Sequence, residues 1–298
     1  MQSIRIHKSN PENRSLYRTA LIITISGNVL LLVIKWIAAY LSGSVALFAD
    51  AANSASDVLY SFLMVLGLWM AQRPPDSSHP QGHSRFEPLV GLMITISMTY
   101  AGYAAASASI QRFVEGGKAI EIGIPVFVLL LAAAIKAGMF AWIRDLAKKL
   151  KSPTLETTAK DNLSDVLTST AAFIGIIGSD FLHPLADPIA GVLVALWIFR
   201  AAFQAAKENL GFLTGAGASD ELRAELVSAA SEIPGVIRVH HAILEYSGPR
   251  LLVDMHINVD GNMPLNQVHE ICDQVIERLE SFSEVDRAYV HIEPEGWD

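Results

Sequence analysis

Two stretches decide the fold of this chain: Asn53-Ser-Ala-Ser-Asp57-Val-Leu-Tyr-Ser61 and Asp161-Asn-Leu-Ser-Asp165-Val-Leu-Thr-Ser169. Five of the nine positions are identical, including the run Ser-Asp-Val-Leu. Each stretch lies in a long apolar segment, the second and the fifth of six, so corresponding positions are offset by three segments. Helices related in this way cross a membrane in opposite directions. An inverted repeat of three plus three spans is typical of transporters.

The surrounding chain has the composition of a membrane protein, because 51% of its 298 residues are hydrophobic and only 17% are charged. A soluble domain carries about a quarter charged residues. A helix needs about 20 apolar residues to cross about 30 Å of hydrocarbon. Six segments approach this length, at 16–41, 45–71, 87–113, 122–146, 155–182 and 187–207. We therefore expect a six-helix transmembrane domain over residues 1–212.

Basic residues indicate how these spans are oriented, since loops rich in Lys and Arg stay on the cytoplasmic side. They precede the first span, flank the loop between spans two and three, lie between spans four and five, and follow span six. The alternate loops carry at most one, Lys118. Both termini should face the cytoplasm of a multi-pass cell-membrane protein, in a bacterial or archaeal plasma membrane.

Residues 213–298 differ from the preceding part of the chain in charge and in sequence pattern. This part holds 5 Lys and Arg against 16 Asp and Glu, whereas residues 1–212 hold 17 against 14. Helical periodicity over 219–231 and 266–280, and strand alternation over 236–246, 250–259 and 286–293, predict the order αββαβ. This order is typical of a small α+β domain with its helices on one face of a sheet.

Polar groups inside the spans form the strongest chemical signal. Asn53 and Asp57 are four residues apart, as are Asp161 and Asp165, so each pair projects from one face of its helix. Facing helices would gather four oxygen-bearing side chains, and carboxylates in hydrocarbon require neutralisation by a cation or by protons. The sequence therefore predicts a cation site here.

Two alternative interpretations of these acids are open. The carboxylates could instead be paired with a lysine of another span, for which Lys35 and Lys136 are the candidates. Asp50 lies three residues before Asn53 and could join the group, although a capping role at the end of its helix is favoured.

Asp76, His79 and His83 form a second candidate site in the loop between spans two and three. One carboxylate and two imidazoles within eight residues suit a metal ion of borderline softness. The alternative is an ordinary polar loop with two solvated histidines.

The acidic tail contains a third group, rich in histidine, which is the commonest metal ligand. Any one of these residues alone is more often a surface histidine, but their density favours a metal site at a subunit interface. The candidate ligands are His240, His256, His269, His291 and Glu293, with His241 nearby.

Two motifs, SGSVALFADAANSASD at residues 42–57 and HPQGHSRFEPL at residues 79–89, resemble the cation diffusion facilitator family. The Asp161 and Asp165 pair and the αββαβ tail extend this resemblance over residues 15–295. It implies six spans, a homodimer, a metallochaperone-like tail of ferredoxin type, and export of divalent metal coupled to proton import. It also assigns Asn53, Asp57, Asp161 and Asp165 to the transport site, and the loop and tail residues to further metal sites.

The transport set departs from that of zinc-transporting members, which usually carry histidine where this chain has Asp161 and often where it has Asn53. The Asn-Asp-Asp-Asp set is similar to that of manganese exporters in the family. An all-oxygen set favours Mn²⁺ over Zn²⁺. Mn²⁺ is therefore the expected substrate and tail regulator, with Zn²⁺ or Fe²⁺ as the alternative, and no permanent cofactor is expected.

Other function classes find less support. The acidic balance and the lack of a basic stripe exclude nucleic-acid binding. Phosphate-binding loops, nucleophile elbows and HExxH motifs are missing from the sequence, which weighs against an ATP-driven pump and a membrane metalloprotease. A membrane-embedded metalloenzyme would need a base beside a substrate cavity, and the sequence offers none beyond the ligands themselves, so we do not expect an enzyme. A membrane-bound metal sensor or scaffold that does not transport remains the rival from another class.

Overall fold

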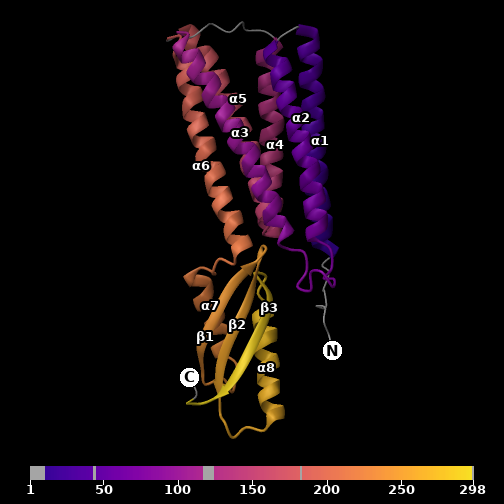
Figure 1. The fold of residues 1–298 in the computed structure, drawn as a ribbon, viewed down its shortest axis with the longest axis vertical. Coiled ribbons are helices and arrows are strands. Elements are labelled where there is room, and N and C mark those ends of the chain that lie inside the picture. The colour runs from indigo at the N-terminus through magenta and orange to yellow at the C-terminus, as the bar shows by residue number, and fades with distance from the viewer. Residues whose placement is uncertain (1–10, 43–44, 117–123, 182, 297–298) are drawn as a thin grey trace. The chain divides into compact units, whose positions relative to one another are not determined.

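The computed structural model describes residues 11–42, 45–116, 124–181 and 183–296, and Figure 1 shows its elements. Six long helices come first. They are α1 (Pro11–Ser42), α2 (Val45–Ala71), α3 (Phe86–Val114), α4 (Ile124–Leu150), α5 (Pro153–Phe181) and α6 (Ala186–Thr214). The chain divides into two compact units, Met1–Leu210 and Gly211–Asp298.

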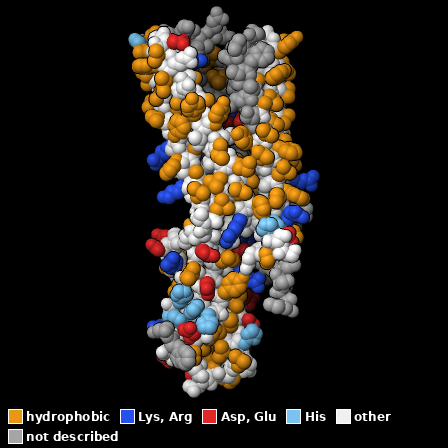
Figure 2. All heavy atoms as spheres, in the orientation of Figure 1, with side chains coloured by type: hydrophobic (Ala, Val, Ile, Leu, Met, Phe, Trp, Pro, Cys, Tyr) orange, Lys and Arg blue, Asp and Glu red, His pale blue; other side chains and the backbone are white. Residues whose placement is uncertain are grey.

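Four of the six helices are long and apolar enough to cross a membrane within the described residues: α1, α3, α4 and α6. The remaining two, α2 and α5, carry the acidic pairs, and the described part of α2 includes a further apolar stretch, Asp57–Ala71. Large apolar side chains such as Trp36, Tyr100, Trp142 and Phe203 are more than half exposed on the outside of the helices. Figure 2 shows apolar side chains covering the helical unit, as expected of a surface in contact with lipid.

Close helix contacts hold this unit together. The α2 and α3 helices meet at Gly67, where a Cβ atom would lie 1.8 Å from Cγ2 of Val90. A side chain at this position would therefore force the two helices apart, which is why small residues are common at membrane helix interfaces. The central packed residues include Met64, Leu68, Met98, Ile143 and Leu155.

The second unit is an α+β domain. Its elements are α7 (Asp220–Ser231), β1 (Arg238–Ser247), β2 (Arg250–Val259), α8 (Leu265–Glu280) and β3 (Val285–Pro294). The sheet order is β1-β2-β3, with β1 antiparallel and β3 parallel to β2. The predicted class, a helical membrane domain followed by an αββαβ domain, is confirmed.

Alternation along β2 separates the two faces of this sheet. Leu251, Val253, Met255 and Ile257 are buried in one core with residues of α7 and α8. Successive side chains of a strand point to opposite faces, so His256 lies on the face opposite the helices. The sheet is thus packed on one side and carries polar groups on the other.

Two leucines of α8, one buried and one exposed, test the packing of this core. Leu279 is fully buried and Leu265 is 83% exposed. Leu279→Ala should destabilise the domain by about 2–5 kcal/mol, because removing a buried isobutyl group leaves a cavity. Leu265→Ala on the same helix should have little effect. Hydrogen exchange of the β2 amides in the full-length protein measures both, and equal protection in the two variants would contradict this packing.

Candidate metal centres

The acidic pairs of α2 and α5 converge on one lysine of α4. Lys136 Nζ lies 2.7 Å from Asp165 Oδ2 and 3.3 Å from Asp57 Oδ2. The lysine side chain is only 5% exposed. Two predicted ligands from different helices therefore meet at a single point, where a positive charge already lies between them.

Asp161 lies one helical turn before Asp165 on α5 and lines a small cavity of about 20 Å³ together with Asp57. Among the described residues, its carboxylate has no hydrogen bond or ion pair. A polar cavity of this size has room for about one water molecule or a bare ion. The structure thus groups three carboxylates around one ammonium and one small polar cavity.

The ion-pair alternative raised by the sequence is realised by Lys136, one of its two candidate lysines. Lys35 is also buried, on α1. The side chains of Asn53 and Asp50 lie outside the described residues, so their part in the group stays a prediction. A lysine at the carboxylates accounts for charge neutralisation without metal, and a metal ion would have to replace it.

Glu87 is a buried acid whose structural role could not be predicted from the sequence. It is buried at the start of α3, and its carboxylate accepts hydrogen bonds from Tyr17 Oη at 3.2 Å and from Ser152 Oγ. The hydroxyl of Thr154 donates to the Glu87 backbone carbonyl. Ser152 also accepts from the Leu155 amide in the first turn of α5. Glu87 therefore ties the beginning of α5 to α3 and α1.

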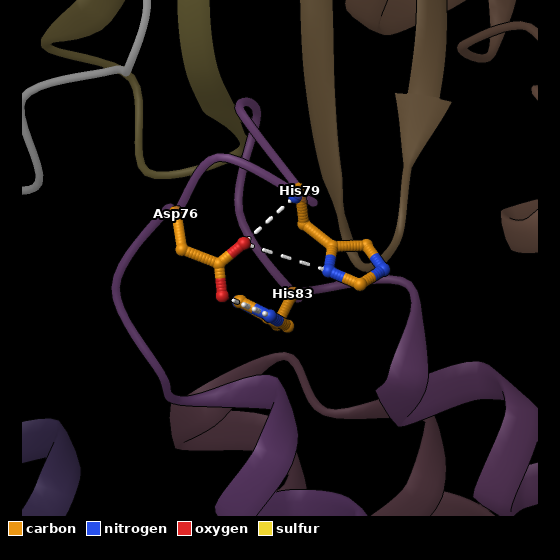
Figure 3. Close-up of side chains that lie close together, drawn as sticks. All are labelled: Asp76, His79 and His83. Carbon is orange, nitrogen blue, oxygen red and sulfur yellow. Dashed lines mark hydrogen bonds and ion pairs between the residues drawn. The ribbon is translucent and has the colours of Figure 1, made fainter.

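The loop between α2 and α3 brings Asp76, His79 and His83 together, as Figure 3 shows. His83 Nε2 lies 3.4 Å from Asp76 Oδ2, and His79 Nδ1 lies 3.7 Å from Asp76 Oδ1. One ligand atom from each residue lies within 4.8 Å of the others. This separation is wider than a metal site requires, so binding would draw the three side chains inward.

Backbone groups hold the loop carboxylate in place. The amides of His79 and Ser78 donate to Asp76 Oδ1 at 2.8 and 2.9 Å. These hydrogen bonds, with the nearby histidines, hold the pKa of Asp76 below its ordinary value. The carboxylate is therefore ionised and available as a ligand at neutral pH.

A second cluster lies on the open face of the sheet and contains His240, His256 and Glu293. His240 Nε2 lies 3.0 Å from Glu293 Oε2, and His256 Nδ1 lies 3.9 Å from Glu293 Oε1. The β1–β2 register shifts between Val239 and His241, which is where His240 lies. A bulge of this kind re-aims a side chain.

Asn258 supports this cluster and was not predicted. Its Oδ1 lies 3.0 Å from His240 Nδ1, which leaves the other ring nitrogen facing Glu293. Partners that bind the second nitrogen of a histidine orient it as a metal ligand. Asn258 is opposite Glu293 in the β2–β3 register, a relation that only the strand pairing reveals.

The two other predicted tail ligands differ in position. His291 is opposite His256 in the register and lies 3.4 Å from Glu293 Oε1, at the exposed edge of the cluster. His269 lies on α8, is 75% exposed, and is paired with Asp273 one turn along. The structure does not bring His269 to the cluster within this chain.

This difference leads to a prediction for metal binding by the tail. His240→Ala should weaken the affinity of the full-length protein for added Zn²⁺ or Mn²⁺ at this site by about 10–100-fold, since a ligand is removed. His269→Ala is the matched control and should change little. Isothermal titration in detergent measures both, and a larger loss in the His269 variant would contradict the assignment.

Comparison with known proteins identifies the family. The cation efflux transmembrane domain matches residues 21–214, and the cytoplasmic domain of cation efflux proteins, a dimer-forming domain, matches residues 218–295. An uncharacterised transporter of Methanocaldococcus jannaschii is 36% identical over 274 residues, covering 92% of this chain and 96% of that protein. The manganese efflux system protein MneS of Bacillus subtilis is 28% identical over 273 residues, covering 92% and 94%.

Relatives also include the magnetosome protein MamM of Magnetospirillum gryphiswaldense, 30% identical over 270 residues, with 85% of this chain and 83% of MamM covered. A solved structure of the MamM C-terminal domain is 30% identical, covers 26% of this chain and 98% of its own, and has a TM-score of 0.25. Since both family domains match in order over nearly the whole length, the chain belongs to the cation efflux family of divalent metal transporters.

Proposed function

We propose that this protein is a homodimeric antiporter that exports divalent cations, preferably Mn²⁺, from the cytoplasm in exchange for protons. The observation that carries the proposal is the convergence of Asp57 and Asp165 on one point beside Asp161, within membrane helices. Carboxylates buried at such a depth are costly and are retained mainly for function. The transport site consists of these three carboxylates and Asn53.

Metal binding at this site is an exchange of cations. Lys136 neutralises Asp57 and Asp165 while no metal is bound, and an incoming divalent ion takes its place between the two carboxylates. Protons compete for the same oxygens, because a carboxylate must be deprotonated to bind metal. Binding from one side and proton-driven release to the other produce antiport when the helices rock around the site.

The donor set favours Mn²⁺. Three carboxylates and one amide supply only oxygen, and carboxylate and carbonyl ligands suit Mn²⁺, whereas imidazole suits Zn²⁺. Two relatives from Bacillus subtilis carry the name manganese efflux system protein. Zn²⁺ and Fe²⁺ are the alternative substrates, because intrinsic affinity rises from Mn²⁺ through Fe²⁺ toward the later metals.

The histidine cluster of the tail regulates transport in this proposal. The tail cluster of His240, His256 and Glu293 binds metal when its cytoplasmic level is high and stabilises the transport-competent dimer. His291 and His269 extend this site, the latter through the partner subunit. The loop cluster of Asp76, His79 and His83 is a separate site. The protein lies in the cell membrane with both termini in the cytoplasm.

Transport by a carboxylate site predicts that flux depends on these acids. In proteoliposomes, Asp57→Ala and Asp165→Ala should reduce Mn²⁺ flux by about 100-fold or more, since each removes a charged ligand. Asp145→Ala, an exposed acid on α4, is the control and should retain flux.

The same vesicles are loaded in parallel with Mn²⁺, Fe²⁺ and Zn²⁺, and the wild type should transport Mn²⁺ best. Unchanged flux in the two variants would favour a sensor or scaffold. Preferred Zn²⁺ transport would overturn the metal assignment.

Exchange with Lys136 predicts the effect of removing the competing ammonium. Lys136→Met should lower the KM for Mn²⁺ by roughly tenfold, equivalent to about 1.4 kcal/mol, because metal no longer displaces a bound cation. Turnover should fall because release becomes slower. Lys149→Met, which removes an exposed lysine paired with Asp145 on the same helix, should match the wild type. A KM that rises or stays constant in the Lys136 variant would show that the lysine does not compete with metal.

A further inference from the structure

The cavity beside Asp57 and Asp161 is lined by a residue of α1 that the transport site described so far does not include. Asn28 lines it, with α2, α3 and α5 supplying the other walls. The side chain is buried, with 6% of the residue exposed. A neutral amide in this position faces the same small space as two carboxylates.

Hydrogen bonding determines which end of this amide is free. Ser61 lies one turn after Asp57 on α2, and its hydroxyl donates to the Asp57 backbone carbonyl at 2.7 Å. Because a hydroxyl has a single proton, Ser61 Oγ can only accept from Asn28, whose Nδ2 lies 2.7 Å away. The amide nitrogen is therefore committed to Ser61, and the other end of the side chain is the carbonyl oxygen Oδ1.

That oxygen has no hydrogen-bond partner among the described residues, although it is buried. Buried carbonyl oxygens almost always have a donor or a cation as partner. Lys136 is engaged by Asp57 and Asp165, and Thr24 on the same wall donates to its own helix at Ala20. Asn162 Nδ2 lines the same cavity and is also without a partner, so the two side chains form no hydrogen bond with each other. The Asn28 oxygen is therefore available to a cation that enters the cavity.

We propose that Asn28 is an additional metal-contacting residue, which brings α1 into the transport site and favours Mn²⁺ over Zn²⁺. The inference rests on the proposed function and extends its ligand set. Carbonyl oxygen is a preferred ligand of Mn²⁺, which takes six oxygen ligands, whereas Zn²⁺ is usually satisfied by four. Four ligands from α2 and α5 are enough for the tetrahedral coordination of Zn²⁺. A fifth ligand, from Asn28, therefore strengthens the binding of Mn²⁺ more than that of Zn²⁺.

Two substitutions of similar volume separate the oxygen from the packing of the side chain. Asn28→Leu removes the oxygen and excludes water from its place, while Asn28→Asp retains an oxygen at the same position. In proteoliposomes, Asn28→Leu should lower kcat/KM for Mn²⁺ by roughly tenfold and for Zn²⁺ by less than about twofold. Asn28→Asp should retain the Mn²⁺ preference. If the leucine variant does not reach the membrane, Asn28→Ala replaces it.

Asn209 provides the matched control. It is buried on α6 with an unpartnered carbonyl oxygen, and its amide donates to Thr157 Oγ1 at 3.0 Å, outside the lining of this cavity. Asn209→Leu should therefore leave the ratio of Mn²⁺ to Zn²⁺ transport unchanged. An equal shift of this ratio in the Asn209 and Asn28 variants would overturn the inference.

Electron paramagnetic resonance measures Mn²⁺ binding by the protein in detergent. This measurement separates the proposed export function from the proposed metal contact of Asn28. Wild-type protein that moves no metal would overturn the proposed function, yet weaker Mn²⁺ binding by Asn28→Leu would still support the contact. Equal loss for both metals, or no loss of either binding or flux, would overturn the role of Asn28 while leaving the exporter in place.

Discussion

The ion pairs of Lys136 with Asp57 and Asp165 are the interaction on which the helical unit depends. Charges of either sign are costly inside a membrane, and pairing reduces that cost only while both partners are present. These pairs connect α2, α4 and α5 at one point. A divalent ion offers the carboxylates more charge than the ammonium does, and this difference makes the same group suitable for reversible metal binding.

The remaining polar contacts position this group. Glu87 fixes the first turn of α5 through Ser152, and Ser61 connects α2 to Asn28 of α1. The Glu87–Ser152 and Asn28–Ser61 contacts are hydrogen bonds between buried side chains of distant segments, where an unpaired group would be costly. The carboxylates therefore lie on elements that are held at defined positions, while the cavity between them leaves space for an ion.

Periodicity was sufficient to predict much of this structure. Four-residue spacing placed Asp161 and Asp165 on one face of α5, and alternation along 250–259 separated the core face of β2 from the face that carries His256. The class of both domains followed from these patterns, because each depends on the local repeat of a helix or a strand.

Contacts between distant segments could not be read in this way. Lys136 and Lys35 were equal candidates, since pairing depends on how α4 packs against α2 and α5. His240 reaches Glu293 through a shift in strand register, and Asn258 is recognised only once β3 is aligned with β2. His269 looked equivalent to the other tail histidines, but it lies on α8 rather than on a strand, and its side chain is exposed to solvent.

The position of Mn²⁺ in the full-length protein tests the central claim most directly. Anomalous scattering from crystals grown with Mn²⁺ would locate the ion without reference to activity. The account predicts a peak among Asp57, Asp161 and Asp165, with the ammonium of Lys136 withdrawn from Asp165. A peak at the histidine clusters alone, with Lys136 still between Asp57 and Asp165, would contradict it.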